Sequence, residues 1–339
     1  MKRKISLGGV KYISDDGTVH LSKSIESIDD LIELGQMYKP GRKYNINLQK
    51  IHAISDILKK LNTMVGLKHI KTTLISQIVY FLQNFHQDEM LHTVIQGPPG
   101  AGKTMLAKIL GEMYHRMNVF NKDVCLDGNY KFVIARRSDL IGEYLGTTAK
   151  KTQKVIDSCN GGVLLIDEAY ALGNREGRDS YSKECIDTLN QNLSENKGNF
   201  MCIIAGYETE LEKSFFNYNE GLRRRFPFVY TMTKYSALEL VDILIFMFQR
   251  DNWKCNNKKG IEKIITEHYK EFDHQAGDME TVALITKLEH SKRVLFLDKS
   301  KKRIIEPVDI EKAVTSFLEQ RHSQKEKQAP PPAPCHMYL

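Results

Sequence analysis

Long hydrophobic runs are missing from the sequence, and their absence argues against a membrane-spanning protein. The longest apolar stretch, LVDILIFMF at residues 240–248, is short and is interrupted by Asp242. A transmembrane helix needs about 20 consecutive, mainly apolar residues, so we expect no membrane partner. Met1 is followed by Lys-Arg-Lys and then by no apolar run, so we also expect no secretory signal.

Cysteine pairs with the spacing of a metal or redox site are also absent. The six cysteines stand at positions 125, 159, 185, 202, 255 and 335, and none forms a C-x-x-C pair. Several lie in apolar surroundings, such as Cys202 in FMCIIAG, which is typical of small core residues that stay reduced. We therefore expect a reducing, cytoplasmic environment.

A strong excess of one charge is missing as well. The 339 residues carry a formal net charge of +7, and 41% are hydrophobic and 27% charged, which is typical of a soluble globular protein. Basic residues form only short clusters, such as those at 223–225 and 301–303. A nucleic-acid-binding surface usually has a concentrated basic stripe, so we do not expect nucleic acid as a partner.

Apolar patterning predicts four parts. Residues 1–60 form an N-terminal extension with helical stripes. Residues 61–233 alternate short apolar runs with amphipathic helices, which predicts an α/β domain with a buried parallel sheet and helices on both faces. In residues 234–320 only helical patterns remain, so we expect a small all-helical domain. Residues 321–339 are charged and then proline-rich, so we expect a flexible tail.

The individual elements follow from the same pattern. In the α/β domain, five apolar runs predict strands at 92–96, 131–135, 161–167, 200–206 and 227–232. Shorter strands are predicted at 4–7 and 17–21. Helices are predicted at 25–38, at 49–61, after Gly66, and in the last part at 237–250, 260–272, 279–296 and 306–321.

Residues 97–104 read GPPGAGKT and fit the phosphate-binding pattern G-x-x-x-x-G-K-[ST], between a predicted strand and a predicted helix. Backbone N–H groups of such a loop, together with the N-terminus of the following helix, bind phosphates. We expect Lys103 to reach the β- and γ-phosphates of ATP and the Thr104 hydroxyl to bind Mg²⁺. The predicted nucleotide contacts in this segment are Gly97, Pro98, Pro99, Gly100, Ala101, Gly102, Lys103, Thr104 and Met105.

The apolar run GGVLLID, at residues 161–167, ends in two adjacent carboxylates, Asp167 and Glu168. Charges at the tip of a buried strand are costly unless they have a role. Asp167 is placed to hold Mg²⁺ through its water shell, and Glu168 to orient and deprotonate the attacking water. This pair indicates that ATP is hydrolysed and not merely bound.

Taken together, GPPGAGKT, LLIDEAYAL and the helical C-terminal part resemble the AAA+ ATPases. Within them the pattern is similar to the CbbX-like branch, which holds the red-type Rubisco activases and stage V sporulation protein K. Four further stretches carry the resemblance: NTMVGLKHIK (62–71), SDLIGEYLGTTAKKT (138–152), CIIAGYETELE (202–212) and NEGLRRRF (219–226). Several large DNA viruses carry proteins of similar pattern, and for a viral chain the expected location is the host cytoplasm or the virion.

The resemblance covers residues 62–318 and implies a fold and a set of roles. The fold is a P-loop AAA+ core of three αβα layers with a five-stranded parallel sheet, followed by a small all-helical lid domain. Three residues of the first stretch resemble the segment that contacts adenine: Val65, Gly66 and Leu67.

The same resemblance identifies an arginine finger. Arg225 resembles the finger that reaches the γ-phosphate bound by a neighbouring subunit, and Arg223 and Arg224 are rivals for that role. A cation there stabilises the charge that spreads over the transferring phosphoryl group. A finger that acts on a neighbour requires a homo-oligomer, and the family builds hexameric rings.

Two positions depart from the usual pattern of these ATPases. At the end of the predicted strand FMCIIAG, Gly206-Tyr207 replaces a polar sensor residue. The CbbX-like branch has the same A-G-Y, so this departure fits the resemblance. Glu280 stands where the family has a sensor arginine, and a carboxylate repels phosphate. Lys287, Arg293 or a neighbouring subunit would have to supply the missing cation.

GEYLGTTAK, at residues 142–150, places an apolar pair between two glycines. Tyr144, Leu145 and Gly146 resemble the aromatic–aliphatic–glycine triplet that lines the pore of AAA+ rings and grips a polypeptide. A ring of tyrosines offers apolar contacts to many sequences, and the glycines allow the loop to move. The alternative is that Tyr144 packs into a core or a subunit interface.

These features favour an ATP-hydrolysing ring motor that remodels or threads a protein substrate. One alternative is a DNA-linked AAA+ ATPase, such as a loader or replication motor, although the sequence has no helix-turn-helix signal or zinc-ligand spacing. Another is a slow, nucleotide-gated scaffold, which Glu280 favours. The substrate is not identified by the sequence; residues 1–60 could specify it, or could simply pack on the ATPase domain.

Overall fold

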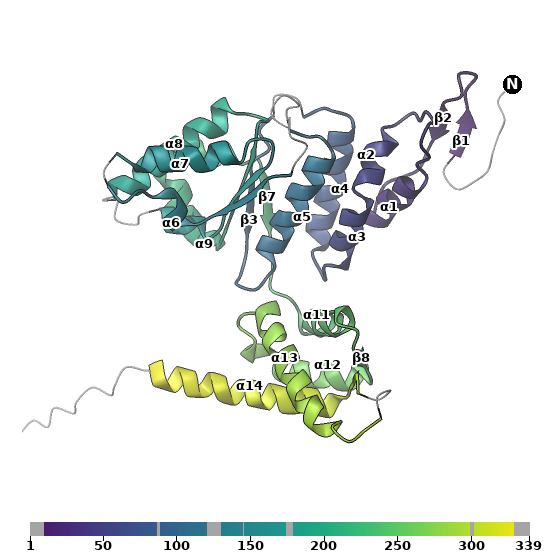
Figure 1. Cartoon of the computed structure of the whole chain (residues 1–339), viewed down its shortest axis with the longest axis vertical. Helices are drawn as coiled ribbons and strands as arrows, with labels where there is room; N and C mark the ends of the chain where they lie inside the picture. Colours follow the sequence, from purple (N-terminus) through teal and green to yellow (C-terminus); the bar gives the residue numbers. More distant parts are fainter. Residues whose placement is uncertain are drawn as a thin grey trace, which may run out of the picture. The chain divides into compact units, whose positions relative to one another are not determined.

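Two compact units make up the chain (Figure 1). The computed structural model describes residues 10–86, 89–120, 130–144, 146–173, 179–298 and 302–328. The first unit consists of Met1–Pro98 and Gly102–Thr233, and the second of Pro99–Ala101 and Lys234–Leu339.

A five-stranded parallel sheet forms the centre of the first unit (Figure 1), and its strands coincide with the five predicted apolar runs. They are β3 (Thr93–Gln96), β4 (Phe132–Ala135), β5 (Val163–Ile166), β6 (Met201–Gly206) and β7 (Phe228–Thr231), in the order β4-β5-β6-β3-β7. Every residue of β3, β5 and β6 is buried. Burial on both faces explains why these strands are almost continuously apolar. The predicted parallel sheet is confirmed.

Helices lie on both sides of this sheet, which confirms the predicted three-layer core. Figure 1 shows α4 (Lys68–Leu82) and α5 (Lys103–Arg116) on one side, and α7 (Thr148–Ser158) and α8 (Ser180–Glu195) on the other. Apolar residues of α7 and α8 share one buried cluster with β5 and β6.

Short helical segments connect the strands at the carboxyl edge of the sheet. After β4 comes α6 (Arg137–Leu140), and after β5 comes the 3₁₀ turn η1 (Ala169–Leu172). After β6 the chain forms α9 (Glu208–Glu210), η2 (Leu211–Phe215), η3 (Phe216–Tyr218) and α10 (Glu220–Arg223). Ligands of open parallel sheets bind at this edge, so these turns surround the expected site.

The N-terminal residues form a hairpin and three helices. Strands β1 (Val10–Ile13) and β2 (Val19–Leu21) pair antiparallel, and α1 (Ile28–Gln36), α2 (Leu48–Ala53) and α3 (Ser55–Thr63) follow. The single helix predicted at 49–61 is in fact two helices, because the backbone at Ile54 leaves the helical region with φ −105° and ψ 3°. The strand predicted at 4–7 lies outside the described residues.

Part of this N-terminal region packs on the sheet domain. Arg116, at the end of α5, pairs with Asp56 of α3 at 2.8 Å and donates to the Ala53 carbonyl at 3.2 Å. Lys50 of α2 donates to the Asn84 side chain at 3.0 Å. The helical stripes of this region are therefore used at least partly for packing within the unit.

The second unit consists mainly of α11 (Ala237–Arg250), α12 (Lys258–Glu267), α13 (Ala276–Arg293) and α14 (Pro307–Gln328). It also holds a parallel pair of two-residue strands, β8 (Lys254–Cys255) and β9 (Ile304–Ile305), so the expectation of a purely helical domain was wrong in this detail. Strands this short have no periodicity that a sequence pattern can reveal.

The C-terminal helix is longer than the sequence pattern predicted. α14 continues to Gln328, past the point where we expected the flexible tail to begin. Residues 321–328 are rich in Gln, Lys and Glu, which are good helix formers. Residues 329–339 of the predicted tail lie outside the described residues.

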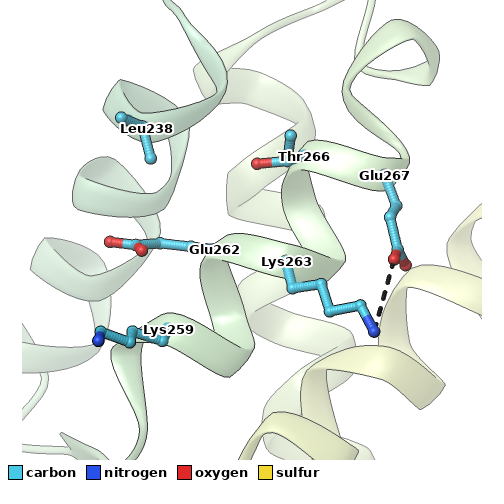
Figure 2. A pocket seen from close by; sticks show the side chains of 6 residues that line it. All are labelled: Leu238, Lys259, Glu262, Lys263, Thr266 and Glu267. Carbon is cyan, nitrogen blue, oxygen red and sulfur yellow. Dashed lines mark ion pairs between the residues drawn. The ribbon is translucent and has the colours of Figure 1, made fainter.

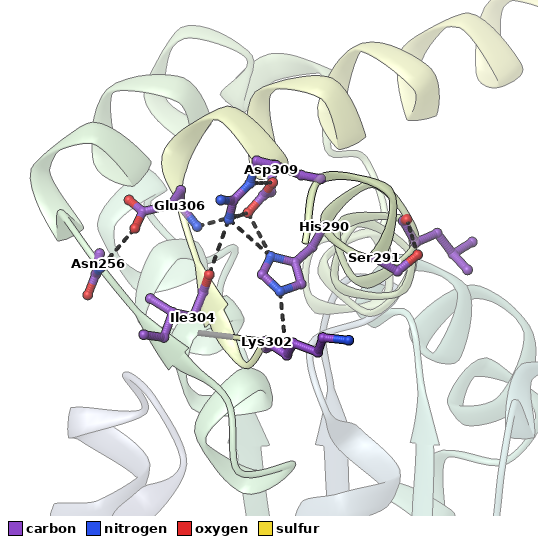
Figure 3. Close-up of polar contacts among 9 residues, drawn as sticks. Asn256, His290, Ser291, Lys302, Ile304, Glu306 and Asp309 are labelled. Atoms are coloured by element: carbon purple, nitrogen blue, oxygen red, sulfur yellow. Dashed lines mark hydrogen bonds and ion pairs between the residues drawn. The ribbon is translucent and has the colours of Figure 1, made fainter. Parts of the chain in front are cut away.

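A buried charged cluster joins α13 to α14 (Figure 3). Arg293 donates to the Asp309 carboxylate at 2.7 Å, and His290 Nδ1 lies 3.0 Å from the same group. His290 Nε2 lies 3.0 Å from the Lys302 carbonyl oxygen. Burial raises the pKa of Asp309, but hydrogen bonds from Arg293, the Glu306 N–H and His290 lower it to about 2. The carboxylate therefore stays charged inside this unit.

A solvent-open groove lies between α11 and α12 (Figure 2). Its lining is of mixed charge and comprises Leu238, Lys259, Glu262, Lys263, Thr266 and Glu267. Lys263 and Glu267 form an ion pair at 3.9 Å across one turn of α12. The groove contains none of the predicted site residues.

Within the described ranges, every helix is too short or too polar to cross a lipid bilayer.

Candidate active site

The GPPGAGKT segment connects β3 to α5, as the sequence predicts. Gly97, Gly100 and Gly102 have φ values of 154°, 67° and 91°, which residues with a side chain rarely adopt. The loop can therefore turn its N–H groups inward, and α5, which begins at Lys103, directs its N-terminus to the same place. Met105, the last predicted contact, is 49% exposed in the first turn of α5.

The side chain of Lys103 folds back into the phosphate-binding loop. Its Nζ donates to the carbonyl oxygens of Gly97 at 3.0 Å and Pro98 at 2.8 Å. Burial lowers the pKa of Lys103, while the negative charges of Asp167 and Glu168 act in the opposite direction. The ammonium group is thus close enough to both carboxylates to feel their charge.

Thr104 and Asp167 meet at the carboxyl edge of the sheet, with 3.5 Å between Thr104 Oγ1 and Asp167 Oδ2. The Asp167 carboxylate also accepts a hydrogen bond from the Glu168 N–H at 3.1 Å. One hydroxyl and one carboxylate are a small ligand set, and the described residues contain no group of three or more His, Cys, Asp or Glu side chains that could hold a metal. This set suits Mg²⁺, which usually takes one or two protein oxygens together with phosphate and water.

Glu168 has strained backbone geometry. Its φ of 53° and ψ of 42° are in the left-handed region, which is unfavourable for a residue with a side chain. Its carbonyl accepts a hydrogen bond from the Ala171 N–H at 2.8 Å, which stabilises the turn η1. Strain of this kind persists only where the surrounding structure enforces it, and it is common at catalytic positions.

The predicted adenine segment, Val65–Leu67, forms a second strained turn at the start of α4. Leu67 is left-handed, with φ 58° and ψ 26°. Lys71 Nζ donates to the carbonyl oxygens of Met64 at 2.7 Å and Asn62 at 3.2 Å, and so holds the chain just before the turn. Among the described residues, no hydrogen bond joins this turn to Lys103 or Asp167.

The three candidate finger arginines have different surroundings. Arg225 is half-buried and donates to Ser194 Oγ and to the Gly221 carbonyl, each at 2.6 Å. Arg223 pairs with Glu212 at 3.2 Å. Arg224 is exposed and has no side-chain partner within the described ranges.

Tyr144 is 72% exposed, so its ring is not part of the core of this chain. Thr147 Oγ1 donates to the Tyr144 carbonyl at 2.7 Å, and Gly146 has a φ of 80°. The exposed tyrosine ring therefore faces solvent. Leu145, the second residue of the predicted triplet, lies outside the described residues.

The residues expected to replace the missing sensor arginine are engaged elsewhere. Glu280 is exposed in the first turns of α13. Lys287 forms an ion pair with Asp251 at 2.5 Å, and Arg293 is bonded to Asp309. Either cation would have to give up its carboxylate partner to act on a phosphate.

Comparison with known proteins identifies the family. Residues 93–233 match the ATPase family associated with various cellular activities, AAA. A cfxQ-like protein of Acanthamoeba polyphaga mimivirus is 39% identical over 301 residues, which cover 86% of this chain and 72% of that protein. Stage V sporulation protein K of Bacillus subtilis is 34% identical over 228 residues, covering 64% and 68%. The chain belongs to the AAA ATPase family.

One further relative and one solved structure agree with this family. CbbX of Cereibacter sphaeroides is 32% identical over 208 residues, covering 59% of this chain and 65% of that protein. The FIGL-1 AAA domain in complex with ADP aligns with a TM-score of 0.53 and 16% identity, covering 90% of this chain and 98% of that chain, and so shows the shared fold. The resemblance to the CbbX-like branch is confirmed, and this AAA protein binds nucleotide and hydrolyses ATP.

Sequence patterns did not reveal two residues of this AAA site. Tyr170 follows the paired carboxylates and has no predicted role, and Tyr207 is predicted only as part of the replacement for a polar sensor residue. In the structure their rings are stacked, with centroids 5.5 Å apart, beside Lys103. The tyrosine in DEAY was the signal available, but tyrosine is too common for its position alone to indicate a role.

Proposed function

We propose that this AAA ATPase is a ring-forming motor that remodels or threads a protein substrate. The observation that carries the proposal is the 72% exposed ring of Tyr144, on a loop that follows β4 of an AAA core. An exposed tyrosine flanked by glycine offers apolar contact to many polypeptide sequences. The relatives named CbbX and stage V sporulation protein K support the assignment to this branch.

Each residue of the nucleotide site would have a separate role in ATP hydrolysis. Thr104 and Asp167 would hold Mg²⁺, which neutralises charge on the phosphates of bound ATP. Lys103 would bind the β- and γ-phosphates, and Glu168 would orient and deprotonate the attacking water. Val65–Leu67 would contact adenine.

Ring assembly would complete the site. We infer that Arg225 reaches the nucleotide of a neighbouring copy, and that Arg224 is its main rival because it is exposed and unpartnered within the described ranges. Members of this family usually form oligomers, often hexamers, so the proposed assembly is a homo-hexamer.

A slow, nucleotide-gated scaffold is the second candidate. The pairing of Lys287 with Asp251 and of Arg293 with Asp309 favours it, because neither cation is available to replace the arginine missing at Glu280. A protein that lacks this cation could bind ATP firmly and turn it over slowly.

A Glu168→Gln variant tests the proposed function. It should bind ATP, lose at least about a hundredfold in turnover, and retain protein clients on an ATP-loaded ring. Lys103→Ala, which should not bind ATP, is the matched control for capture. Near-normal turnover in Glu168→Gln would refute the catalytic assignment, and copurification of DNA in place of protein would favour the DNA-linked alternative.

A further inference from the structure

An aromatic pair stands where most AAA ATPases have a polar sensor. Tyr207 directly follows β6, and its ring stacks on Tyr170, with an interplanar angle of 22° and centroids 5.5 Å apart. Lys103 Nζ lies 5.1 Å from the centroid of the Tyr207 ring, which is within the range of a cation–π contact. The pair therefore touches the lysine that terminates the phosphate-binding loop.

Gly206 makes room for this arrangement. A Cβ atom at position 206 would lie 3.0 Å from Cδ1 of Tyr170 and 3.0 Å from Cγ of Leu211. That spacing is tighter than ordinary van der Waals contact, so a side chain here would displace the tyrosine ring. The glycine in AGY and the tyrosine in DEAY are thus parts of one packing unit, although they are far apart in the sequence.

Tyr170 is held in place from several sides. Its carbonyl accepts a hydrogen bond from Ser214 Oγ at 3.1 Å, and the next carbonyl, of Ala171, accepts one from Arg137 at 2.8 Å. Burial, and then the charge and hydrogen bonding of Glu168, raise the pKa of Tyr170 to about 12. At neutral pH the hydroxyl is therefore protonated, and it lies near enough to Glu168 to feel the charge of that carboxylate.

We propose that Tyr170 and Tyr207 are positioning residues for ATP hydrolysis and take the place of the polar sensor. The stacked rings would direct the Tyr170 hydroxyl to donate to the Glu168 carboxylate, and the face of Tyr207 holds the ammonium group of Lys103. Support of this kind matters most for Glu168, because its backbone is in the left-handed region just before a short 3₁₀ turn. The inference rests on the proposed catalytic role of Glu168.

A matched pair of substitutions tests the proposal. Tyr170→Phe and Tyr207→Phe each remove one hydroxyl and keep both rings, but only the Tyr170 hydroxyl is proposed to donate to Glu168. We expect Tyr170→Phe to lower kcat about tenfold while KM for ATP and the affinity for ATP change less than about twofold. Tyr207→Phe, which keeps the ring that faces Lys103, should lower kcat less than Tyr170→Phe does. Tyr207→Leu, which removes a ring, should lower kcat like Tyr170→Phe.

A second measurement does not depend on turnover. With 3-fluorotyrosine at position 170, the ¹⁹F resonance of nucleotide-free protein reports the surroundings of that ring. Glu168→Gln and Tyr207→Leu should each shift the resonance, and Arg224→Ala should leave it unchanged. Because the charge of Glu168 raises the pKa of Tyr170, Glu168→Gln should also lower the pH at which the resonance titrates.

Two results would overturn the proposal: equal effects of the two phenylalanine variants, or a resonance that does not respond to Glu168→Gln. Failure of the proposed function gives a different result. If Glu168→Gln is active, the catalytic assignment is wrong. If Glu168→Gln is inactive and Tyr170→Phe is normal, only the positioning role is wrong.

Discussion

Thr104 Oγ1 lies 3.5 Å from Asp167 Oδ2, although the two residues are 63 positions apart in the sequence. Thr104 lies in the first turn of α5, which follows β3, and Asp167 follows β5, with β6 between the two strands. Parallel strands bring their carboxyl ends to one edge of a sheet, and this brings the two motifs together. This pair is placed to hold Mg²⁺.

Asp167→Asn should raise the Mg²⁺ concentration needed for half-maximal ATPase activity by about tenfold, because a neutral amide is a poorer ligand for a hard cation. The measurement is a Mg²⁺ titration of turnover at saturating ATP. Asp157→Asn, on the exposed side of α7, is the control and should behave as wild type. An unchanged Mg²⁺ requirement in Asp167→Asn would remove this residue from the ion site.

Tyr144→Ala should leave folding, ring assembly and basal ATPase activity within about twofold of wild type, since burial of the ring contributes nothing to the core. Remodelling of a captured client, and any stimulation of ATPase activity by it, should be lost. Tyr144→Phe keeps the ring and should retain both. A Tyr144→Ala protein that still remodels its client would contradict threading.

Arg225 and Arg224 should differ in their effect on ATP hydrolysis if Arg225 is the arginine finger. Arg225→Ala should bind ATP but be nearly inactive. Mixing it with Lys103→Ala should restore some turnover, because an interface between the two variants can combine an intact phosphate-binding loop from one subunit with an intact finger from the other. Arg225→Ala also removes hydrogen bonds to Ser194 and Gly221, so Ser194→Ala serves as the control for that structural effect.

The same experiment with Arg224→Ala decides between the rivals. Activity lost in Arg224→Ala at unchanged thermal stability, with recovery in mixed rings, would assign the finger to Arg224. If no mixed ring regains turnover, neither arginine acts on a neighbour.

Lys71→Met should weaken ATP binding about threefold to tenfold and leave kcat nearly unchanged. The hydrogen bonds that it removes stabilise the strained turn at Val65–Leu67 and do not involve the groups that react. Titration of a fluorescent ATP analogue measures the affinity. Lys68→Met, an exposed change in the first turn of the same helix, is the control. A fall in kcat without a change in affinity would place Lys71 in a different role.

Asp309 should make the stability of the second unit depend on acid pH. Its pKa is about 2 in the folded state, below the ordinary value of 3.8. The stabilisation is therefore fully present above about pH 4 and is lost as the pH falls through about 2. Asp309→Asn should remove this dependence and lower the free energy of unfolding by roughly 2 kcal/mol.

The fluorescence of Trp253, the single tryptophan, reports this unfolding, because its ring lies 5.2 Å from that of His290. Asp242→Asn breaks an exposed ion pair with Lys258 and should change stability much less. Equal acid dependence in Asp309→Asn and wild type would show that another group controls it.

Local patterns were sufficient for much of this protein. The five apolar runs predicted five parallel strands because residues buried on both faces of a sheet must be almost continuously apolar. GPPGAGKT and DEAY could be read directly, since a phosphate-binding loop and a carboxylate pair at a strand end each need particular residues at short spacing. The motifs alone therefore predicted nucleotide binding and hydrolysis.

Contacts between distant segments were decided only by the tertiary structure. Tyr170 stacks on Tyr207 because η1 lies beside β6 and because Gly206 leaves space for the ring. A periodic pattern in the sequence cannot predict such a contact. The sequence pattern also did not predict the β8–β9 pair or the break at Ile54. Each strand of the pair has two residues and the break involves one, which is too few to show a periodicity. Spacing along the chain specifies each motif, whereas packing determines which side chains meet and which arginine is already bonded within its own subunit.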